Sequence, residues 1–142
     1  MLKGIPAILS PELLKILMEM GHGDELVIGD GNFPAASCAK RLVRLDGHGA
    51  AEVLDAILRL FPLDSYVETP IELMQVVPGD PVGTPPIWAE YRAIAAKYEP
   101  DAKFGEVERF AFYERAKQAY AIVATGESAL YANLILKKGV VK

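Results

Sequence analysis

Hydrophobic residues alternate between two patterns along this chain, and the alternation restricts its fold more than any other feature. Short apolar runs bounded by turn residues predict strands at residues 25–30, 41–45, 71–77, 107–109, 120–124 and 133–137. Apolar residues at helical spacing predict helices over residues 11–21, 50–61, 84–97 and from about 110. Strands that alternate with helices favour a mostly parallel sheet covered on both faces. Ligands of such sheets bind at the carboxyl ends of the strands.

The length fits a single domain. The chain has 142 residues, 51% of them hydrophobic, with a mean hydropathy of +0.19, which is too apolar for a disordered chain. The proline-rich segment 78–86 is predicted to be a surface loop of that domain, residues 1–142, and not a linker. For so small a body, the apolar excess favours self-association.

Charge and cysteine content exclude several classes of partner. The net charge is -4, with no basic cluster to bind phosphates, so no nucleic-acid partner is expected. The longest apolar run, residues 119–124, is far shorter than the roughly 20 residues that span a bilayer, so no membrane partner is expected. Cys38 is the only cysteine, which favours a reducing compartment, the cytoplasm, and a packing role for its thiol.

Two candidate catalytic residues follow the first predicted helix. His22 stands between two glycines, where it is poorly placed to fill a core and well placed beside a ligand. Asp30 ends the next predicted strand and is expected to bring a carboxylate to the same mouth of the sheet. The alternatives are a surface histidine that caps a helix and an aspartate that forms a turn. With Asp24 and Glu25 they also offer ligands for Mg²⁺ or Mn²⁺, but the spacing matches no metal motif.

Three further polar residues suit a ligand rich in hydroxyl groups. Arg109 lies beside aromatic residues and presents a fixed fork of donors, or else it forms a surface ion pair. Tyr131 and Asn133 offer a phenol and an amide beside the last predicted strand, or else they close a turn. Trp88 and Tyr91, at helical spacing, stay unassigned between packing, an interface and a sugar platform.

Several segments together resemble one known family over nearly the whole chain. The segments MGHGDEL, GDGNFP, ERFAFYERA and TGESALYANLILKKGV are similar to those of the L-fucose mutarotase and D-ribose pyranase family. SPELL near the start, PLDSYVE in the middle, the Asn-Phe-Pro at 32–34 and the closing LKKGV favour its fucose branch, with the ribose branch as second choice.

The resemblance implies a fold, an assembly and an activity. The fold is a three-layer α/β/α sandwich with a mostly parallel central sheet. The assembly is a ring-like homo-oligomer, a decamer or octamer, with sites near subunit contacts. The implied activity is that of an isomerase that interconverts the α and β anomers of L-fucose with no cofactor or metal.

The resemblance also assigns roles to five residues. His22 aligns with the catalytic acid and base, while Asp30, Arg109, Tyr131 and Asn133 match positions that contact the sugar. An imidazole, with an unperturbed pKa of about 6.5, can remove or supply the protons that ring opening requires.

Asp30 is expected to orient the imidazole or a sugar hydroxyl, Arg109 to favour negative charge on an oxygen, and Phe33 to face the C6 methyl group. His48 matches no functional position and is expected to be a loop or helix-start residue that tolerates mutation. The alternative functions are D-ribose pyranase activity, a sugar-binding or regulatory module without turnover, and a metal-dependent sugar isomerase or lyase.

Overall fold

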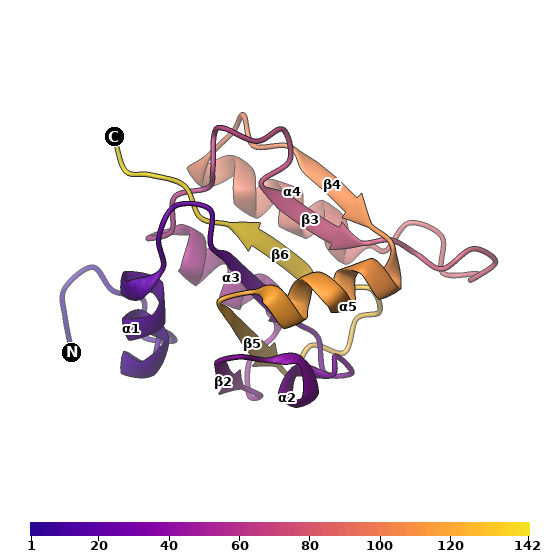
Figure 1. The fold of residues 1–142 in the computed structure, drawn as a ribbon, viewed down its shortest axis with the longest axis horizontal. Helices are drawn as coiled ribbons and strands as arrows, with labels where there is room; N and C mark the ends of the chain where they lie inside the picture. Colours follow the sequence, from indigo (N-terminus) through magenta and orange to yellow (C-terminus); the bar gives the residue numbers. More distant parts are fainter.

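The structure, a computed structural model, describes residues 1–142 (Figure 1). Its sheet has six strands in the order β2-β5-β1-β6-β3-β4. The strands are β1 (Glu25–Gly29), β2 (Leu42–Leu45), β3 (Ile71–Met74), β4 (Phe104–Val107), β5 (Ala121–Thr125) and β6 (Leu134–Lys137). The helices are α1 (Pro11–Glu19), α2 (Ala35–Cys38), α3 (Ala50–Leu58), α4 (Ile87–Tyr98) and α5 (Arg109–Gln118). None of them is long and apolar enough to cross a bilayer.

The direction of the strands determines which loops meet at each end of the sheet, where the strands begin or stop. β1 pairs in parallel with β5, β5 with β2, and β3 with β4. β6 runs antiparallel to both of its neighbours, β1 and β3. The prediction of a mostly parallel sheet is confirmed. The start of β6 lies at the same edge as the carboxyl ends of the other five strands.

Helices cover both faces of the sheet, as predicted. On one face, α1, α3 and α4 form the larger apolar core, which includes Leu13, Leu54 and Tyr91. On the other face, α2 and α5 form a smaller core around Phe112 and Ala116. The four inner strands between them are largely buried, and every residue of β5 is buried. This is a three-layer α/β/α sandwich.

The first helix begins where the sequence predicts. The Ser10 hydroxyl accepts a hydrogen bond from the Leu13 backbone N–H at 3.1 Å, and Pro11 occupies the first helical position. After Glu19 the chain turns through the glycine-flanked histidine into β1.

The largest error in the predicted elements falls at β4, which runs from 104 to 107 and not from 107 to 109. Glu108 is instead the N-cap of α5, because its carboxylate accepts from the backbone N–H groups of Phe110 and Ala111. Three other boundaries move by three residues, since α3 ends at Leu58, β3 ends at Met74 and α4 starts only after Pro86. The short helix α2 was not predicted.

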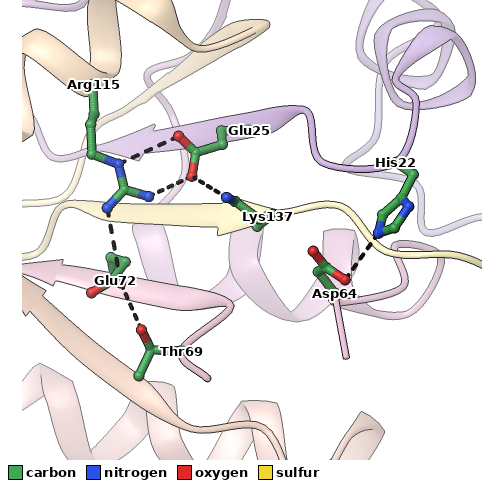
Figure 2. A network of polar contacts seen from close by, with 7 residues as sticks. All are labelled: His22, Glu25, Asp64, Thr69, Glu72, Arg115 and Lys137. Carbon is green, nitrogen blue, oxygen red and sulfur yellow. Dashed lines mark hydrogen bonds and ion pairs between the residues drawn. The ribbon is translucent and has the colours of Figure 1, made fainter. Parts of the chain in front are cut away.

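An ionic network ties α5 to three strands (Figure 2). Arg115 binds both carboxylate oxygens of Glu25 and lies 3.9 Å from Glu72. Lys137 Nζ lies 4.0 Å from Glu25, and the Thr69 hydroxyl donates to Glu72 at 2.7 Å. The two glutamates are 17% and 16% exposed, so Arg115 neutralises charge that water reaches poorly. The network holds α5 in place, and Arg109 is at the start of that helix.

Replacing Arg115 with alanine is expected to lower the free energy of unfolding by about 2 kcal/mol, because two poorly hydrated carboxylates lose their main counter-charge. Urea unfolding of the two proteins measures this. Lys117→Ala is the matched control, since it removes an exposed ion pair with Glu114 from the same helix and is expected to change stability by less than about 1 kcal/mol. Equal effects of the two substitutions would contradict this view of the network.

Candidate active site

A pocket of about 290 Å³ opens at the edge of the sheet where the parallel strands end. It gathers four of the five residues that the sequence singles out: Asp30, Arg109, Tyr131 and Asn133. Its other lining residues are Asn32, Phe33, Met74, Val77, Asp80, Tyr113 and Leu130. The prediction that a ligand site lies at the carboxyl ends of the strands agrees with this position.

Asp30 and Asn133 form the floor of the pocket. Asp30 directly follows β1, and its backbone N–H donates to the Asn133 side-chain oxygen at 2.7 Å. One carboxylate oxygen of Asp30 accepts from the Asn32 backbone N–H at 3.0 Å. Both side chains are buried, and burial raises the pKa of the Asp30 carboxyl group. The floor therefore carries an acidic group that is poorly hydrated and open to the pocket.

Two side chains of α4 donate hydrogen bonds to the backbone of residues 131 and 132, next to the pocket. Tyr131 has a φ of 54°, a left-handed conformation that only glycines share with it in this chain. The Trp88 indole N–H donates to the Tyr131 carbonyl at 2.8 Å, and the Tyr91 hydroxyl donates to the Ala132 carbonyl at 2.7 Å. Trp88 and Tyr91 are both buried. They are packing residues that also fix the conformation of the pocket backbone.

Replacing Tyr91 with phenylalanine is expected to cost about 1–2 kcal/mol of stability, because the buried Ala132 carbonyl loses its side-chain donor. Thermal unfolding measures the loss. Tyr98→Phe is the control, because the hydroxyl of Tyr98 bonds Asp55 at an exposed position where water can replace it. A larger loss in the control would rule out the proposed role of Tyr91.

The Tyr131 hydroxyl is fixed above the floor by a second acidic residue. It donates to Asp80 at 2.7 Å and accepts from the Val77 backbone N–H at 3.3 Å. The hydrogen bond between Tyr131 and Asp80 lowers the pKa of the Asp80 carboxyl group and raises the pKa of the Tyr131 phenol. The pocket thus has two carboxyl groups whose pKa values are shifted in opposite directions.

Arg109 supplies the positive charge of the pocket. It is the first residue of α5, is exposed, and its Nε donates to the Tyr113 hydroxyl at 3.1 Å. The guanidinium carbon lies 5.3 Å and 5.5 Å from the ring centres of Phe110 and Tyr113. The alternative of an ion pair with a neighbouring glutamate is wrong, because the side-chain partner is a phenol.

Four apolar side chains line the pocket, and together they are called its apolar wall: Phe33, Met74, Val77 and Leu130. The Phe33 ring packs edge-on against Phe112, with ring centres 5.7 Å apart. A Cβ atom at Gly29 would lie 2.9 Å from Phe33, so only glycine there lets this ring fold back against the strand. The wall can face a non-polar group of a ligand.

His22 does not lie in this pocket, so the expectation that it shares a mouth of the sheet with Asp30 is wrong. His22 precedes β1 and Asp30 follows it, and a five-residue strand spans roughly 15 Å. The two side chains therefore lie at opposite edges of the sheet. Within one chain, Asp30 cannot orient the imidazole.

The actual neighbours of His22 come from the loop between α3 and β3. Its Nε2 lies 3.1 Å from an Asp64 carboxylate oxygen, and its ring centre lies 5.3 Å from that of Tyr66 (Figure 2). The imidazole is 45% exposed, whereas the Asp64 side chain is 4% exposed. His22 is thus presented at the surface by a buried carboxylate.

Other candidates have structural positions. His48 precedes α3, as expected, and its Nδ1 pairs with Glu52 at 2.9 Å on the surface. Cys38 is a free thiol packed against the smaller core. Nowhere do three or more His, Cys, Asp or Glu side chains gather as a metal-ligand set, and Glu25 is engaged by Arg115.

Sequence reasoning missed Asp64, Asp80 and Tyr113. Asp64 lies between Pro62 and Pro70, and Asp80 lies in the proline-rich loop 78–86. In neither loop does a periodic pattern mark a side chain as buried or as facing a site. Tyr113 is one turn after Arg109 in α5, and this spacing was the one available signal.

Comparison with known proteins identifies the family. Residues 3–141 match the model of the RbsD / FucU transport protein family. The chain therefore belongs to this family. It is 53% identical to fucose mutarotase of Homo sapiens, over 98% of this chain and 94% of the human protein. The resemblance drawn from the sequence motifs is confirmed.

Two solved structures of family members have the same fold. The crystal structure of FucU from Bifidobacterium longum superposes with a TM-score of 0.95 at 59% identity, covering 99% of this chain and 100% of the other. The fucose mutarotase of Streptococcus pneumoniae, solved in complex with L-fucose, gives a TM-score of 0.93 at 55% identity, with the same coverage.

Proposed function

We propose that the chain is an L-fucose mutarotase, an isomerase that interconverts the α and β anomers of L-fucose. The observation that carries this proposal is the pocket, which gathers Asp30, Arg109, Tyr131 and Asn133 around one apolar wall. Carboxylate, guanidinium, phenol and amide groups suit the hydroxyls of a monosaccharide. The apolar wall suits the C6 methyl group of a 6-deoxy sugar. A relative at 55% identity is solved with L-fucose bound, which supports the same ligand here.

The reaction requires only proton transfers. A base removes the proton of the anomeric hydroxyl, the bond between C1 and the ring oxygen breaks, and the ring oxygen takes up a proton. The open aldehyde rotates about the C1–C2 bond and closes by the reverse steps on its other face. Neither electrons nor a second substrate are exchanged, so acid–base groups are sufficient.

His22 is the proposed acid and base, and the pocket residues hold the sugar. Arg109 stabilises negative charge that develops on an oxygen, since its donors are fixed before the reaction. Asp30 accepts a hydrogen bond from a sugar hydroxyl, while Tyr131 and Asn133 bind further hydroxyls.

His22 and the pocket lie at opposite edges of one chain, so we infer that two copies form each site. The exposed His22 imidazole, at one end of the sheet, would meet the pocket at the opposite end of the sheet in the next copy. Contact between different surfaces of identical chains closes into a ring when the rotation permits. Exposed apolar residues lie on both surfaces: Tyr66 beside His22, and Leu130 at the pocket. We therefore also propose a ring-like homo-oligomer, a decamer or octamer. A cytoplasmic location is proposed as well, because a reducing compartment suits the free Cys38 thiol.

Mixing two inactive variants tests the shared site. His22→Ala keeps an intact pocket, and Asn133→Leu keeps an intact histidine. Dissociation and reassembly of an equal mixture is expected to restore about a quarter of the wild-type activity, because one neighbouring pair in four joins the two intact parts. Each variant reassembled alone is the control. Absence of any recovery from mixtures shown to contain both chains would place the complete site within one chain.

Magnetisation-transfer NMR on L-fucose at equilibrium tests the function itself. We expect catalytic amounts of protein to speed exchange between the α and β signals, with no metal or nucleotide added. D-Ribose is the comparison sugar, because it lacks the methyl group that the apolar wall would face. Tight L-fucose binding with an unchanged exchange rate would replace this proposal with a sugar-binding module.

A further inference from the structure

We propose that Asp80 is the positioning residue for Tyr131: it accepts the phenol proton, so that the Tyr131 oxygen can only accept a hydrogen bond from the sugar. This inference rests on the proposed function, in which Tyr131 binds a hydroxyl of L-fucose. It assigns a role to an aspartate of the loop between β3 and α4, and it fixes the direction of one hydrogen bond to the substrate.

Tyr131 is held at both of its ends, so the place of its hydroxyl is set before a sugar arrives. At the backbone end, the Trp88 indole N–H donates to the Tyr131 carbonyl at 2.8 Å. At the other end, the phenol donates to Asp80 Oδ2 at 2.7 Å and accepts from the Val77 backbone N–H at 3.3 Å. Asp80 and Tyr131 both line the pocket, so the phenol is fixed where a ligand can reach it.

The loop between β3 and α4 fixes the Asp80 carboxylate in turn. The Asp80 backbone N–H donates to the Val77 carbonyl at 3.1 Å, and Asp80 Oδ1 accepts from the Val82 backbone N–H at 3.0 Å. Gly79 has a φ of 90°, which a residue with a side chain rarely adopts. Figure 1 shows this loop extending beyond the end of β3. One oxygen of Asp80 is thus bound to its own loop, and the other is directed to the phenol.

The direction of the hydrogen bond decides what the phenol can offer a ligand. A phenol has one proton to donate, and an ionised carboxylate only accepts. The hydrogen bond from Tyr131 lowers the pKa of the Asp80 carboxyl group, which keeps it ionised near neutral pH. Because the phenol proton lies between the two residues, the Tyr131 oxygen is left as an acceptor.

The ligand group that meets Tyr131 must therefore be a donor. Arg109 lines the same pocket and can only donate, whereas Asp80 and the Tyr131 oxygen accept. A free hydroxyl can donate to one group and accept from another, but an ether oxygen can only accept. The pair of Asp80 and Tyr131 thus selects a sugar with a free hydroxyl at this place.

The chain contains a matched pair outside the pocket. The Tyr120 hydroxyl donates to Glu19 Oε2 at 2.9 Å, and this hydrogen bond also raises the pKa of its phenol. Neither residue lines the pocket. Glu19→Ala therefore removes a carboxylate from a phenol without changing the proposed sugar site.

The first measurement is a ¹³C NMR titration of protein labelled at the Cζ atoms of tyrosine, with Tyr131→Phe to assign the Tyr131 signal. A free phenol has a pKa of about 10. The hydrogen bond to Asp80 raises the pKa of Tyr131, while the charge of Arg109 lowers it by less. We expect a raised pKa in the wild type that falls in Asp80→Ala and stays unchanged in Glu19→Ala. An ordinary pKa of Tyr131 in the wild type would overturn the proposal, and this readout requires no Asp80 variant to fold.

The second measurement is the dependence of the exchange rate on L-fucose concentration. Asp80→Ala is expected to raise KM about 3- to 10-fold, the usual effect of one hydrogen bond. We expect a smaller change in kcat, because this hydrogen bond orients the sugar and takes no part in proton transfer. Asp80→Asn is expected to recover most of the loss, since its amide oxygen can still accept the phenol proton. Glu19→Ala is expected to leave both constants unchanged.

A double-variant cycle separates positioning from direct contact with the sugar. If Asp80 acts through the phenol, Asp80→Ala has no further effect on KM in protein that already carries Tyr131→Phe. Losses that multiply in the double variant would show that Asp80 binds the sugar itself, and they would overturn the positioning role. A wild-type KM in folded Asp80→Ala protein would overturn it as well.

The two measurements separate this inference from the proposed function. If wild-type protein fails to speed L-fucose exchange, the proposed function is wrong, and the titration still decides whether Asp80 holds the Tyr131 proton. If the wild type is active and Asp80→Ala leaves KM unchanged, only the role of Asp80 is wrong.

Discussion

Replacing His22 with alanine is expected to slow L-fucose anomer exchange by about 100- to 10,000-fold, the usual contribution of a positioned acid–base group. No other histidine can take over, because His48 is held at the start of α3 in its own pair with Glu52. The fold is expected to survive, since His22 is 45% exposed and Asp64 keeps the Tyr66 backbone N–H as a partner. Exchange NMR with circular dichroism and native mass spectrometry measures rate, fold and assembly.

The control for this experiment is His48→Ala. It removes an exposed imidazole with a similar ion pair, and it is expected to leave the exchange rate unchanged. Turnover of His22→Ala above about a tenth of the wild-type value would exclude His22 as the principal acid and base. Proton transfer would then fall to the carboxyl groups of the pocket.

The sequence predicts the sheet well because its four inner strands are largely buried on both faces. Such strands are continuous apolar runs, as in β5, where all five residues are buried. β4 differs because it is an edge strand with no buried residue, whereas β2, the other edge strand, keeps Val43 buried. A sequence of Phe, Gly, Glu and Val carries little of the apolar signal that marks the other strands.

Four of the five candidate residues are grouped correctly because they follow or precede strand ends at one edge. Asp30 comes directly after β1, Arg109 shortly after β4, and Asn133 directly before β6. His22 was misplaced because it is near Asp30 in sequence, while an intervening strand carries the chain to the opposite edge of the sheet.

The partners of the site residues were beyond sequence reasoning. Asp64 meets His22 across 42 positions, and Asp80 meets Tyr131 across 51. Both aspartates lie outside the helices and strands, so no periodicity indicates which way they face. Their partners depend on how distant loops pack at an edge of the folded sheet.

The second large effect is expected for Asp30→Asn, which should lower activity and raise stability at neutral pH. Burial raises the pKa of the Asp30 carboxyl group, so the ionised form costs the folded state free energy. That cost is fully present above the raised pKa, and it vanishes as pH falls below the ordinary value of about 3.9. Asparagine is neutral and keeps an oxygen that can accept from the Asn32 backbone N–H. It therefore avoids the cost without losing this contact.

Asparagine is a weaker acceptor for a sugar hydroxyl than a poorly hydrated carboxylate, so exchange is expected to slow by about 100-fold. Thermal unfolding at pH 7 and pH 3, with exchange NMR at pH 7, measures both effects. The stability gain should be clear at pH 7 and absent at pH 3. Asp80→Asn is the matched control from the same pocket. The Tyr131 hydroxyl lowers the pKa of Asp80, so this substitution should instead destabilise the protein at pH 7. Stability changes of the same sign in the two variants would show that the two carboxyl groups do not have the opposed environments described here.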